Sequence, residues 1–206
     1  MEGQGDIKRR NFLKKTVLVA VAVSVSGLKA CKEDDNTDPI GNDCVTTKDI
    51  LGPFYKAGAP FQENIIPPEN KAAPLYIMGK VSGNCNTLLK DAIVEIWNAN
   101  TEGIYDISDA YKFRGQFKTE TDGLYRFKTI IPGRYLNGGT YRPSHIHFKI
   151  TAPGYNELVS QIYFKDDPFI TVDPWAADPS ARERILPLGK DENGSDTVTF
   201  DIYLTT

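Results

Sequence analysis

Seven short runs of alternating apolar and polar residues, separated by turn residues, constrain the fold of this chain most strongly. They cover residues 75–82, 92–97, 113–119, 124–130, 145–152, 158–164 and 197–204. Such runs are typical of β-strands with one buried face. Thr121-Asp122-Gly123 predicts a hairpin turn, and Glu192-Asn193-Gly194 predicts a second turn. The best helical pattern, at residues 179–185, is short. We therefore predict an all-β fold, a two-sheet β-sandwich.

The run at residues 145–152 carries the only two histidines of the 206-residue chain. Successive side chains of a strand point to opposite faces, so His145 and His147 share one face with Lys149, and the intervening apolar residues share the other. Two imidazoles on one face can form half of a metal site, although His-x-His pairs also occur on ordinary solvated strands. The pair therefore needs further ligands from elsewhere in the chain.

The N-terminal residues resemble a bacterial export signal. A basic run with the pair Arg9-Arg10 precedes an apolar stretch from Thr16 to Leu28, which is too short to span a bilayer. The arginine pair followed by Asn-Phe-Leu-Lys resembles a twin-arginine signal, with an ordinary signal peptide as the alternative. The stretch closes with Leu28-Lys29-Ala30-Cys31, which resembles a lipobox despite the unusual lysine. We therefore expect lipidation of Cys31.

These features predict three parts: an export signal of the twin-arginine or lipoprotein type at residues 1–30, a flexible tether at residues 31–43, and one folded domain at residues 44–206. The expected location is the periplasm or the outer surface. Six of the 24 Lys and Arg but only two of the 27 Asp and Glu lie in residues 1–30, so the mature chain would be acidic. We therefore expect no nucleic-acid partner, and membrane contact only through the lipid anchor.

Export also bears on the remaining cysteines. With Cys31 lipidated, Cys44 and Cys85 form an even pair in an oxidising compartment, and we expect them to be disulfide-bonded. The alternative is two buried free thiols.

Two long connections separate the predicted strands, at residues 98–112 and 131–144. Loops of that length in a compact domain are usually functional or disordered. Tyr105 lies in the first loop and Tyr135 in the second. A loop tyrosine is most often a packing residue, so neither tyrosine is informative by itself.

Taken together, five blocks of this sequence resemble the intradiol ring-cleaving dioxygenases, non-haem iron(III) enzymes that open catechols between the two hydroxyl-bearing carbons. The blocks are GPFYKAGAP (52–60), VEIWNAN followed by GIY (94–105), DGLYRFKTI (122–130), PGRY (132–135) and RPSHIHF (142–148). They occur in the order in which the family has them, and the resemblance covers roughly residues 44–170. It implies a β-sandwich whose long loops carry a metal site.

The resemblance implies that Tyr105, Tyr135, His145 and His147 are the ligands of Fe(III). Iron(III) is a hard cation that favours anionic oxygen, and two tyrosinates with two neutral imidazoles suit it. A trivalent metal would also favour ionisation of a phenol whose free pKa is about 10. The expected reaction converts a small aromatic diol and O2 into a cis,cis-muconate-type dicarboxylate.

Further roles follow from the resemblance. Tyr135 would act as a base, and Arg142 would stabilise negative charge on the activated ring, a task suited to a guanidinium that never deprotonates. Gln161 would lie beside the iron site. Ile50 and Pro53 are candidates for the wall of the substrate pocket.

Some features depart from the family pattern. The span from Tyr135 to Arg142 is short, and Tyr141 stands where a tryptophan often precedes the arginine, so neither catechol nor protocatechuate is assigned as the substrate. The chain has no counterpart of the long helical region by which catechol-type enzymes dimerise, so an oligomer is compatible with the sequence but not specified by it.

Three alternatives to an active dioxygenase remain. A metal-free, prealbumin-like β-sandwich binding module would explain Tyr135 but not the combination of Tyr105, His145 and His147. A zinc enzyme would use the histidine pair, although no Asp, Glu or Cys lies at ligand spacing. A degenerate dioxygenase would retain iron but bind its ligand without cleaving it.

Overall fold

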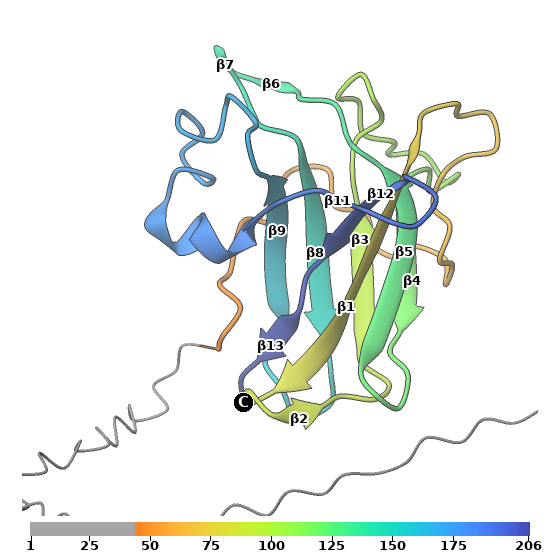
Figure 1. Cartoon of the computed structure of the whole chain (residues 1–206), viewed down its shortest axis with the longest axis vertical. Coiled ribbons are helices and arrows are strands. Elements are labelled where there is room, and N and C mark those ends of the chain that lie inside the picture. Colours follow the sequence, from red (N-terminus) through yellow and green to blue (C-terminus); the bar gives the residue numbers. More distant parts are fainter. Residues whose placement is uncertain (1–43) are drawn as a thin grey trace, which may run out of the picture. The chain divides into compact units, whose positions relative to one another are not determined.

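The computed structural model describes residues 44–206. The predicted export signal, the tether and Cys31 lie outside the described residues. Figure 1 shows that the regular secondary structure of the described part is almost all strand, with long connecting loops. No helix in residues 44–206 is both long and apolar enough to cross a membrane. The all-β prediction is confirmed.

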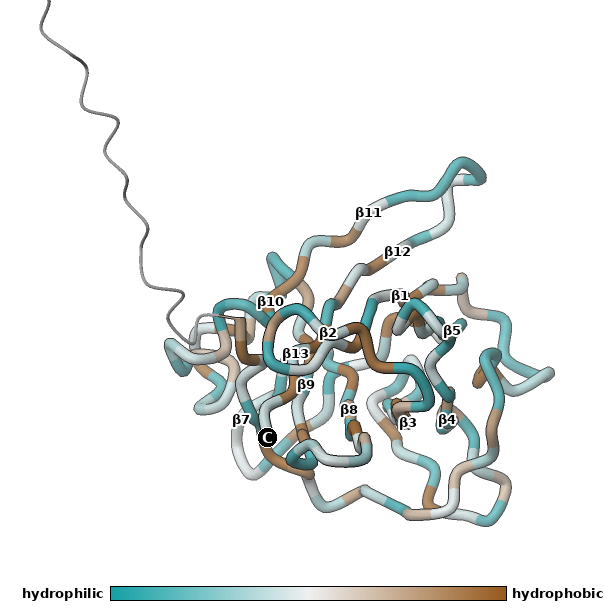
Figure 2. The backbone as a smooth tube through the Cα atoms, turned by 90° about the horizontal axis from the view of Figure 1, so that it is seen from below, coloured by the Kyte–Doolittle hydropathy of each residue, from teal (hydrophilic) through white to brown (hydrophobic). Residues whose placement is uncertain are grey.

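The first sheet is organised around its longest strand, β1. Its six members are β1 (Pro74–Gly83), β2 (Thr87–Leu88), β5 (Leu124–Ile130), β11 (Gly189–Lys190), β12 (Asp196–Thr199) and β13 (Ile202–Leu204). β2 and β5 pair with β1 in antiparallel orientation, whereas β12 and β13 pair with it in parallel. Figure 2 shows the β11–β12 hairpin projecting from the body of the domain, with a hydrophilic tip.

The second sheet carries the histidine strand. Its order is β10-β9-β8-β3-β4, with β3 (Ile93–Trp97), β4 (Arg114–Lys118), β8 (His145–Thr151), β9 (Leu158–Phe164) and β10 (Ile185–Leu186). Two smaller elements complete the described part: the two-stranded pair β6 (Leu136–Asn137) with β7 (Thr140–Tyr141), and the 3-10 helix η1 (Pro179–Arg184). The helix coincides with the predicted short helical pattern.

The main core lies between the two sheets. On β8, Ile146, Phe148 and Ile150 are fully buried in it, as the alternation predicts. Burying a side chain of this size contributes about 1.5–3 kcal/mol relative to exposure. The apolar face of the histidine strand therefore anchors that strand in the sandwich.

The opposite face of the second sheet is also covered. The segment 44–64 crosses this face, because Asp49 N donates to Val159 O of β9 (2.9 Å) and Gln62 N donates to Gln116 O of β4 (3.1 Å). Gly52 of this segment lies against His147, and the two histidines of this face, His145 and His147, are only 2% and 1% exposed. The histidine face is thus an interior surface rather than a solvated one.

The two predicted turns are both present, but one of them connects different strands from those expected. The turn at residues 121–123 exists, with Gly123 N donating to Glu120 O (2.9 Å), but it does not form a hairpin. β4 belongs to the second sheet and β5 to the first, so this turn connects the sheets. The turn at residues 192–194 does join a hairpin, β11–β12, and Gly194 N donates to Asp191 O (3.0 Å).

The predicted strand at residues 197–204 is divided into β12 and β13. Between them the carboxylate of Asp201 accepts the hydrogen bond from Lys80 N (2.9 Å), in place of a backbone carbonyl. The side-chain alternation nevertheless persists, since Val198, Phe200 and Ile202 are all buried. The alternation therefore predicts correctly which side chains are buried. The strand is divided because the side chain of Asp201, and not a backbone oxygen, accepts the hydrogen bond from Lys80 N.

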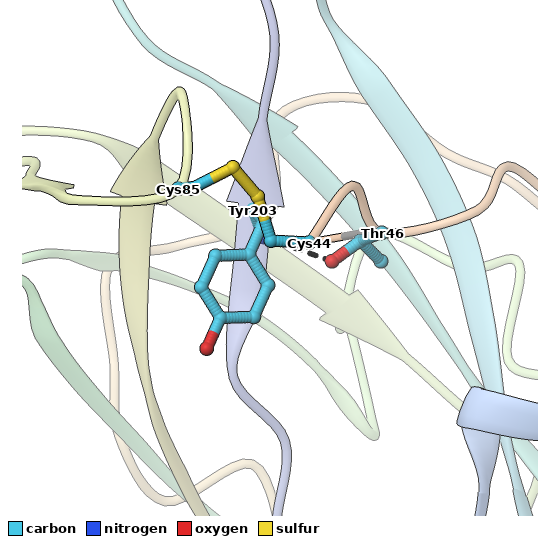
Figure 3. The surroundings of a disulfide bond; sticks show 4 residues. All are labelled: Cys44, Thr46, Cys85 and Tyr203. Carbon is cyan, nitrogen blue, oxygen red and sulfur yellow. Dashed lines mark hydrogen bonds between the residues drawn. A yellow bond between two sulfur atoms is a disulfide. The ribbon is translucent and has the colours of Figure 1, made fainter. Parts of the chain in front are cut away.

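Cys44 and Cys85 are joined by a disulfide across 41 residues, with their Cα atoms 5.5 Å apart (Figure 3). Beside it, Tyr203 N donates to Thr46 Oγ1 (2.8 Å). Cys85 lies just beyond the C-terminal end of β1. That end pairs with the start of β5, whereas the loop that carries Tyr135 follows the end of β5, so the disulfide and this loop lie at opposite ends of the sandwich.

Candidate active site

The four predicted metal ligands lie together in one cluster of rings. Tyr105 and Tyr135 come from the loops that follow β3 and β5, and His145 and His147 come from the start of β8. Ring centroids are 5.8 Å apart for the two tyrosines and 5.0 Å apart for the two histidines. Tyr105 is 6.0 Å from His147, and Tyr135 is 5.6 Å from His145. Residues far apart in the sequence are thus brought within the reach of one ion.

The imidazole of His145 has a defined orientation. Its Nδ1 lies 2.6 Å from the carbonyl oxygen of Pro143, so Nδ1–H donates to that oxygen. The lone pair of Nε2 is then free, and Nε2 lies 3.1 Å from the hydroxyl oxygen of Tyr105. A carbonyl that fixes the tautomer in this way is the usual partner of a metal-binding histidine.

His147 is held by residues that sequence reasoning did not single out. The ring of Trp97 stacks on it at 4.8 Å with an interplanar angle of 8°. Gly52 also contacts the imidazole closely, since a Cβ built there would lie 3.0 Å from its Cε1 atom. Nδ1 of His147 is buried without a hydrogen-bond partner among the described residues. Trp97 and Gly52 both lie inside the matching sequence blocks, so their presence there was the available signal.

Burial determines the charge states in the cluster. It lowers the pKa of His145 to about 3, with the nearby charge of Arg142 acting in the same direction. It also lowers the pKa of His147 well below its ordinary value, with His145 as the next cause. Burial, followed by the proximity of Tyr135, raises the pKa of Tyr105. Both imidazoles are therefore neutral at physiological pH, which is the form that binds metals, whereas the Tyr105 phenol ionises only beside a strong cation.

The donor set suits iron(III). Within residues 44–206 no group of three or more His, Cys, Asp or Glu side chains is arranged to hold a metal. The candidate set instead combines two imidazole nitrogens with two phenol oxygens. Hard trivalent iron prefers such anionic oxygen donors, whereas structural and catalytic zinc sites draw on His, Cys and carboxylates. The residues present therefore fit iron(III).

Arg142 is buried beside this cluster and is firmly anchored. Its Nε donates to Asp173 Oδ2 (2.7 Å), and its Nη2 donates to Tyr163 Oη (3.1 Å). The ring of Trp175 lies 4.4 Å from the centre of the guanidinium. Burial is the largest single influence and opposes the charged form, but the hydrogen bond to Asp173, together with the smaller effects of Tyr163, Tyr135 and the Asp173 charge, raises the pKa of Arg142. Nη1 is buried and has no hydrogen-bond partner among the described residues.

Gln161 is fully buried and pairs with His147 across the β8–β9 ladder. Its amide nitrogen donates to Ile50 O (2.8 Å) and Asp49 Oδ1 (3.2 Å). Its amide oxygen accepts from Arg142 Nη2 (3.3 Å). Gln161 therefore links Arg142 to the segment that covers the histidine face.

A second buried ion pair contacts Gln161 through its main-chain oxygen. Arg184 pairs with Asp49, and Arg184 Nη1 also donates to Gln161 O (2.9 Å). Tyr163 Oη donates to Asp49 Oδ2 (2.9 Å). Burial and the Asp49 carboxylate raise the pKa of Tyr163. Sequence reasoning missed Asp49, Tyr163 and Arg184, because nothing local in the sequence shows that these polar side chains are buried and bonded to one another.

The two predicted pocket residues differ in position. Ile50 is half-buried and lines a cavity of about 290 Å³ together with Asp49, Trp175 and Arg184. Pro53 is exposed. The following residue lines the ring cluster instead: Phe54 stacks on Tyr105 (4.6 Å, 14°) and meets Tyr135 edge-on (5.7 Å, 85°).

Comparison with known proteins agrees with this geometry. The sequence pattern of the dioxygenase family (Dioxygenase_C) matches residues 50–206. The chlorocatechol 1,2-dioxygenase of Rhodococcus opacus is 30% identical over 170 residues, which cover 70% of this chain and 65% of that protein. The catechol 1,2-dioxygenase 1 of Acinetobacter lwoffii is 32% identical over 173 residues, covering 72% and 55%. The chain thus spans less than two thirds of the length of these relatives.

Solved structures of dioxygenases are also similar to this chain. The dioxygenase domain of a dioxygenase–carbohydrate-binding protein fusion from Streptomyces sp. SirexAA-E is 31% identical, with a TM-score of 0.68, over 79% of this chain and 99% of that domain. The catechol 1,2-dioxygenase of Acinetobacter radioresistens is 26% identical, with a TM-score of 0.71, over 78% and 62%.

The fold, the ring cluster and the match over residues 50–206 define the class: the chain belongs to the dioxygenase family. Its relatives named above place it, within that family, among the intradiol ring-cleavage dioxygenases. The prealbumin-like binding module is not favoured.

Proposed function

We propose that this protein is a non-haem iron(III) dioxygenase that opens a catechol-type ring between its two hydroxyl-bearing carbons and yields a cis,cis-muconate-type dicarboxylate. The observation that carries the proposal is the convergence of Tyr105 Oη and His145 Nε2, 3.1 Å apart, in a ring cluster that also contains Tyr135 and His147. Both imidazoles are neutral in that cluster, and their nitrogen donors complement the two phenols.

Iron(III) would be held by Tyr105, Tyr135, His145 and His147, and when bound it would supply a Lewis-acidic centre that makes the diol ring reactive toward O2. The two tyrosines differ in exposure, which suits different roles. Tyr105 is buried, whereas Tyr135 is half-buried. Tyr135 Oη is therefore the better placed to accept a proton from an incoming substrate hydroxyl, while Tyr105 stays in place.

Arg142 would stabilise negative charge on the substrate through its unpartnered Nη1, because Asp173 and Tyr163 fix the rest of the guanidinium. Gln161 would hold this arrangement by binding Arg142 on one side and Ile50 on the other. Phe54 would pack against the aromatic substrate and exclude water from the tyrosine side of the pocket.

The proposed partners are one small aromatic diol and O2, with no nucleic acid, and an oligomer is compatible with the fold. The proposal includes export to the periplasm or outer surface, with lipidated Cys31 as the only membrane contact. Folded export through the twin-arginine route would allow iron to be inserted before translocation. A polar tether would then separate the enzyme from the membrane.

The experiment is reconstitution of the purified protein with Fe(III). The expected result is a burgundy-red solution, from tyrosinate-to-iron charge transfer, whose band shifts when catechol is added. Oxygen uptake with the appearance of muconate absorbance then measures turnover over a panel of substituted catechols. A colourless protein without iron would contradict the proposal. A coloured protein that binds catechols but consumes no oxygen would identify a dioxygenase fold used for binding.

A further inference from the structure

Arg114 is a buried cation of a different kind from the other buried arginines. It lies on β4, is 1% exposed, and has no carboxylate oxygen within 4.0 Å in residues 44–206. Arg142 and Arg184, by contrast, each form an ion pair with a buried aspartate. Burial lowers the pKa of Arg114, and the charges of Asp106 and Glu95 partly oppose this effect. Carboxylates therefore lie near Arg114, but the hydrogen bonds of its guanidinium go to main-chain oxygens.

The guanidinium of Arg114 connects two segments of the site. Its Nε donates to Asp106 O (2.8 Å), the residue that follows Tyr105. Its Nη2 donates to Phe54 O (2.7 Å), and the ring of Phe54 stacks on that of Tyr105. Arg114 thus ties the main chain of the Tyr105 loop to the main chain that presents Phe54.

Arg114 also lies in register with His147, with β3 between their two strands. It pairs with Trp97 across the β3–β4 ladder, Trp97 pairs with His147 across the β3–β8 ladder, and the Trp97 ring stacks on the imidazole. The third nitrogen of Arg114, Nη1, is buried without a partner among the described residues. Arg114 thus hydrogen-bonds to the residue that follows Tyr105, and it lies in one row of the sheet with Trp97 and His147.

We propose that Arg114 is a positioning residue for Tyr105: it holds the loop that carries this proposed ligand against the segment that presents Phe54. This proposal rests on the proposed function, because it concerns Tyr105 as a ligand. It explains why one side chain donates to the carbonyl oxygens of two segments that are far apart in the sequence.

The test compares Arg114→Gln and Arg114→Lys with the wild type and with Arg126→Gln, a half-exposed arginine on β5 that pairs with Glu63. Ga(III), a redox-inert trivalent probe, is titrated into each apoprotein, and tyrosinate formation is followed by ultraviolet difference absorbance. The charge-transfer band of the Fe(III)-loaded protein gives a second readout. Circular dichroism of each apoprotein reports folding.

We expect Arg114→Gln to weaken Ga(III) binding about 10- to 100-fold, the range typical of residues that orient a metal ligand, and to shift the charge-transfer band. Arg114→Lys keeps the charge but has a single nitrogen in place of the two that donate to Asp106 O and Phe54 O, so it should also weaken Ga(III) binding. Arg126→Gln should match the wild type.

Equal affinity and an unchanged band in Arg114→Gln would overturn the proposal. If that variant does not fold, an unchanged Ga(III) affinity in Arg114→Lys overturns it instead. A wild type that binds neither Ga(III) nor Fe(III) would contradict the proposed function itself, which separates the two failures.

Discussion

The backbones of Gly103 and Gly133 are in direct contact, and this contact joins the two loops that carry Tyr105 and Tyr135. A Cβ atom built on Gly133 would collide with Thr101 O and lie 2.5 Å from Gly103 N. Gly133 N also donates to Asn100 O (2.8 Å). Gly103 has a φ of +79°, a conformation that glycine adopts without strain. The spacing of the two tyrosines is thus set by the absence of two side chains.

Gly133→Ala should separate these loops. We expect the free energy of unfolding to fall by about 1–3 kcal/mol, as for other overpacked sites, and Fe(III) binding to weaken because Tyr135 moves relative to Tyr105. Urea denaturation and metal analysis measure the two effects. Gly139→Ala is the matched control, since a Cβ there has nothing within 4 Å. Equal behaviour of the two variants would show that the contact does not position the ligands.

Tyr105→Phe should remove a proposed ligand without disturbing the packing. The phenol oxygen lies 3.1 Å from His145 Nε2, while the ring remains stacked on Phe54. We expect loss of the charge-transfer colour and of turnover, with a thermal midpoint for the apoprotein close to that of the wild type. Visible absorbance and calorimetry check this. A variant that retains the red colour would exclude Tyr105 as the main source of the band.

Asp173→Asn should release Arg142 while leaving the proposed ligands intact. The side chains of Asp173 and Arg142 are 1% and 2% exposed. Removing one partner of a buried ion pair typically costs about 3–5 kcal/mol of stability. We expect a loss of stability in that range and a fall in kcat with the iron colour retained. Arg142→Ala should likewise keep the colour and lose turnover. Loss of iron in either variant would instead indicate that Arg142 supports the ligands.

The apoprotein should lose stability as the pH falls from about 7 toward 5. The pKa of His145 is about 3 in the folded state, mainly through burial, against about 6.5 in an unfolded chain. Below pH 6.5 the unfolded state therefore binds a proton that the folded state does not, and stability declines until the folded pKa is reached. The pKa of His147 is lowered in the same direction.

Urea denaturation at several pH values measures this dependence. Glu95 acts with the opposite sign, because burial raises its pKa and the folded state takes up its proton first. Comparison with His145→Asn isolates the histidine: the variant should show a flatter profile between pH 7 and pH 5. Identical slopes in the two proteins would contradict the assignment.

Reduction of the disulfide should destabilise the domain without affecting metal binding. Cys44 and Cys85 close a loop of 41 residues, for which the chain-entropy model gives about 4 kcal/mol. We expect the Cys44→Ser/Cys85→Ser variant to melt at a lower temperature and to bind Fe(III) as the wild type does. Calorimetry and metal titration check the two halves. Non-reducing mass spectrometry that finds two free thiols in the wild type would contradict the bond.

The strands could be predicted because side-chain alternation is a local signal, and the grouping of the four candidate ligands could be predicted from the resemblance of the sequence blocks. Alternation on β8 placed His145 and His147 on the face opposite Ile146 and Phe148, and that is where the structure has them. The sequence blocks identified Tyr105 and Tyr135, which neither periodicity nor spacing would have singled out.

The remaining features depend on tertiary contacts. A Thr-Asp-Gly turn has the same chemistry whether it closes a hairpin or crosses between sheets, so the sheet change from β4 to β5 had no local signal. Asp49 and Arg184 look like surface residues in the sequence, yet they form a buried pair. Phe54 rather than Pro53 faces the ring cluster, because Arg114 fixes the carbonyl of Phe54 from another strand.

The position of the disulfide has a mechanical consequence. Cys44 begins the segment that passes over β9 and brings Gly52 against His147. Because Cys44 is bonded to Cys85, beyond the end of β1, a pull on the chain before Cys44 is carried by a covalent bond into the longest strand of the first sheet. Tension applied there would bypass the segment that covers His147. The disulfide lies at the end of the sandwich opposite the loop that carries Tyr135.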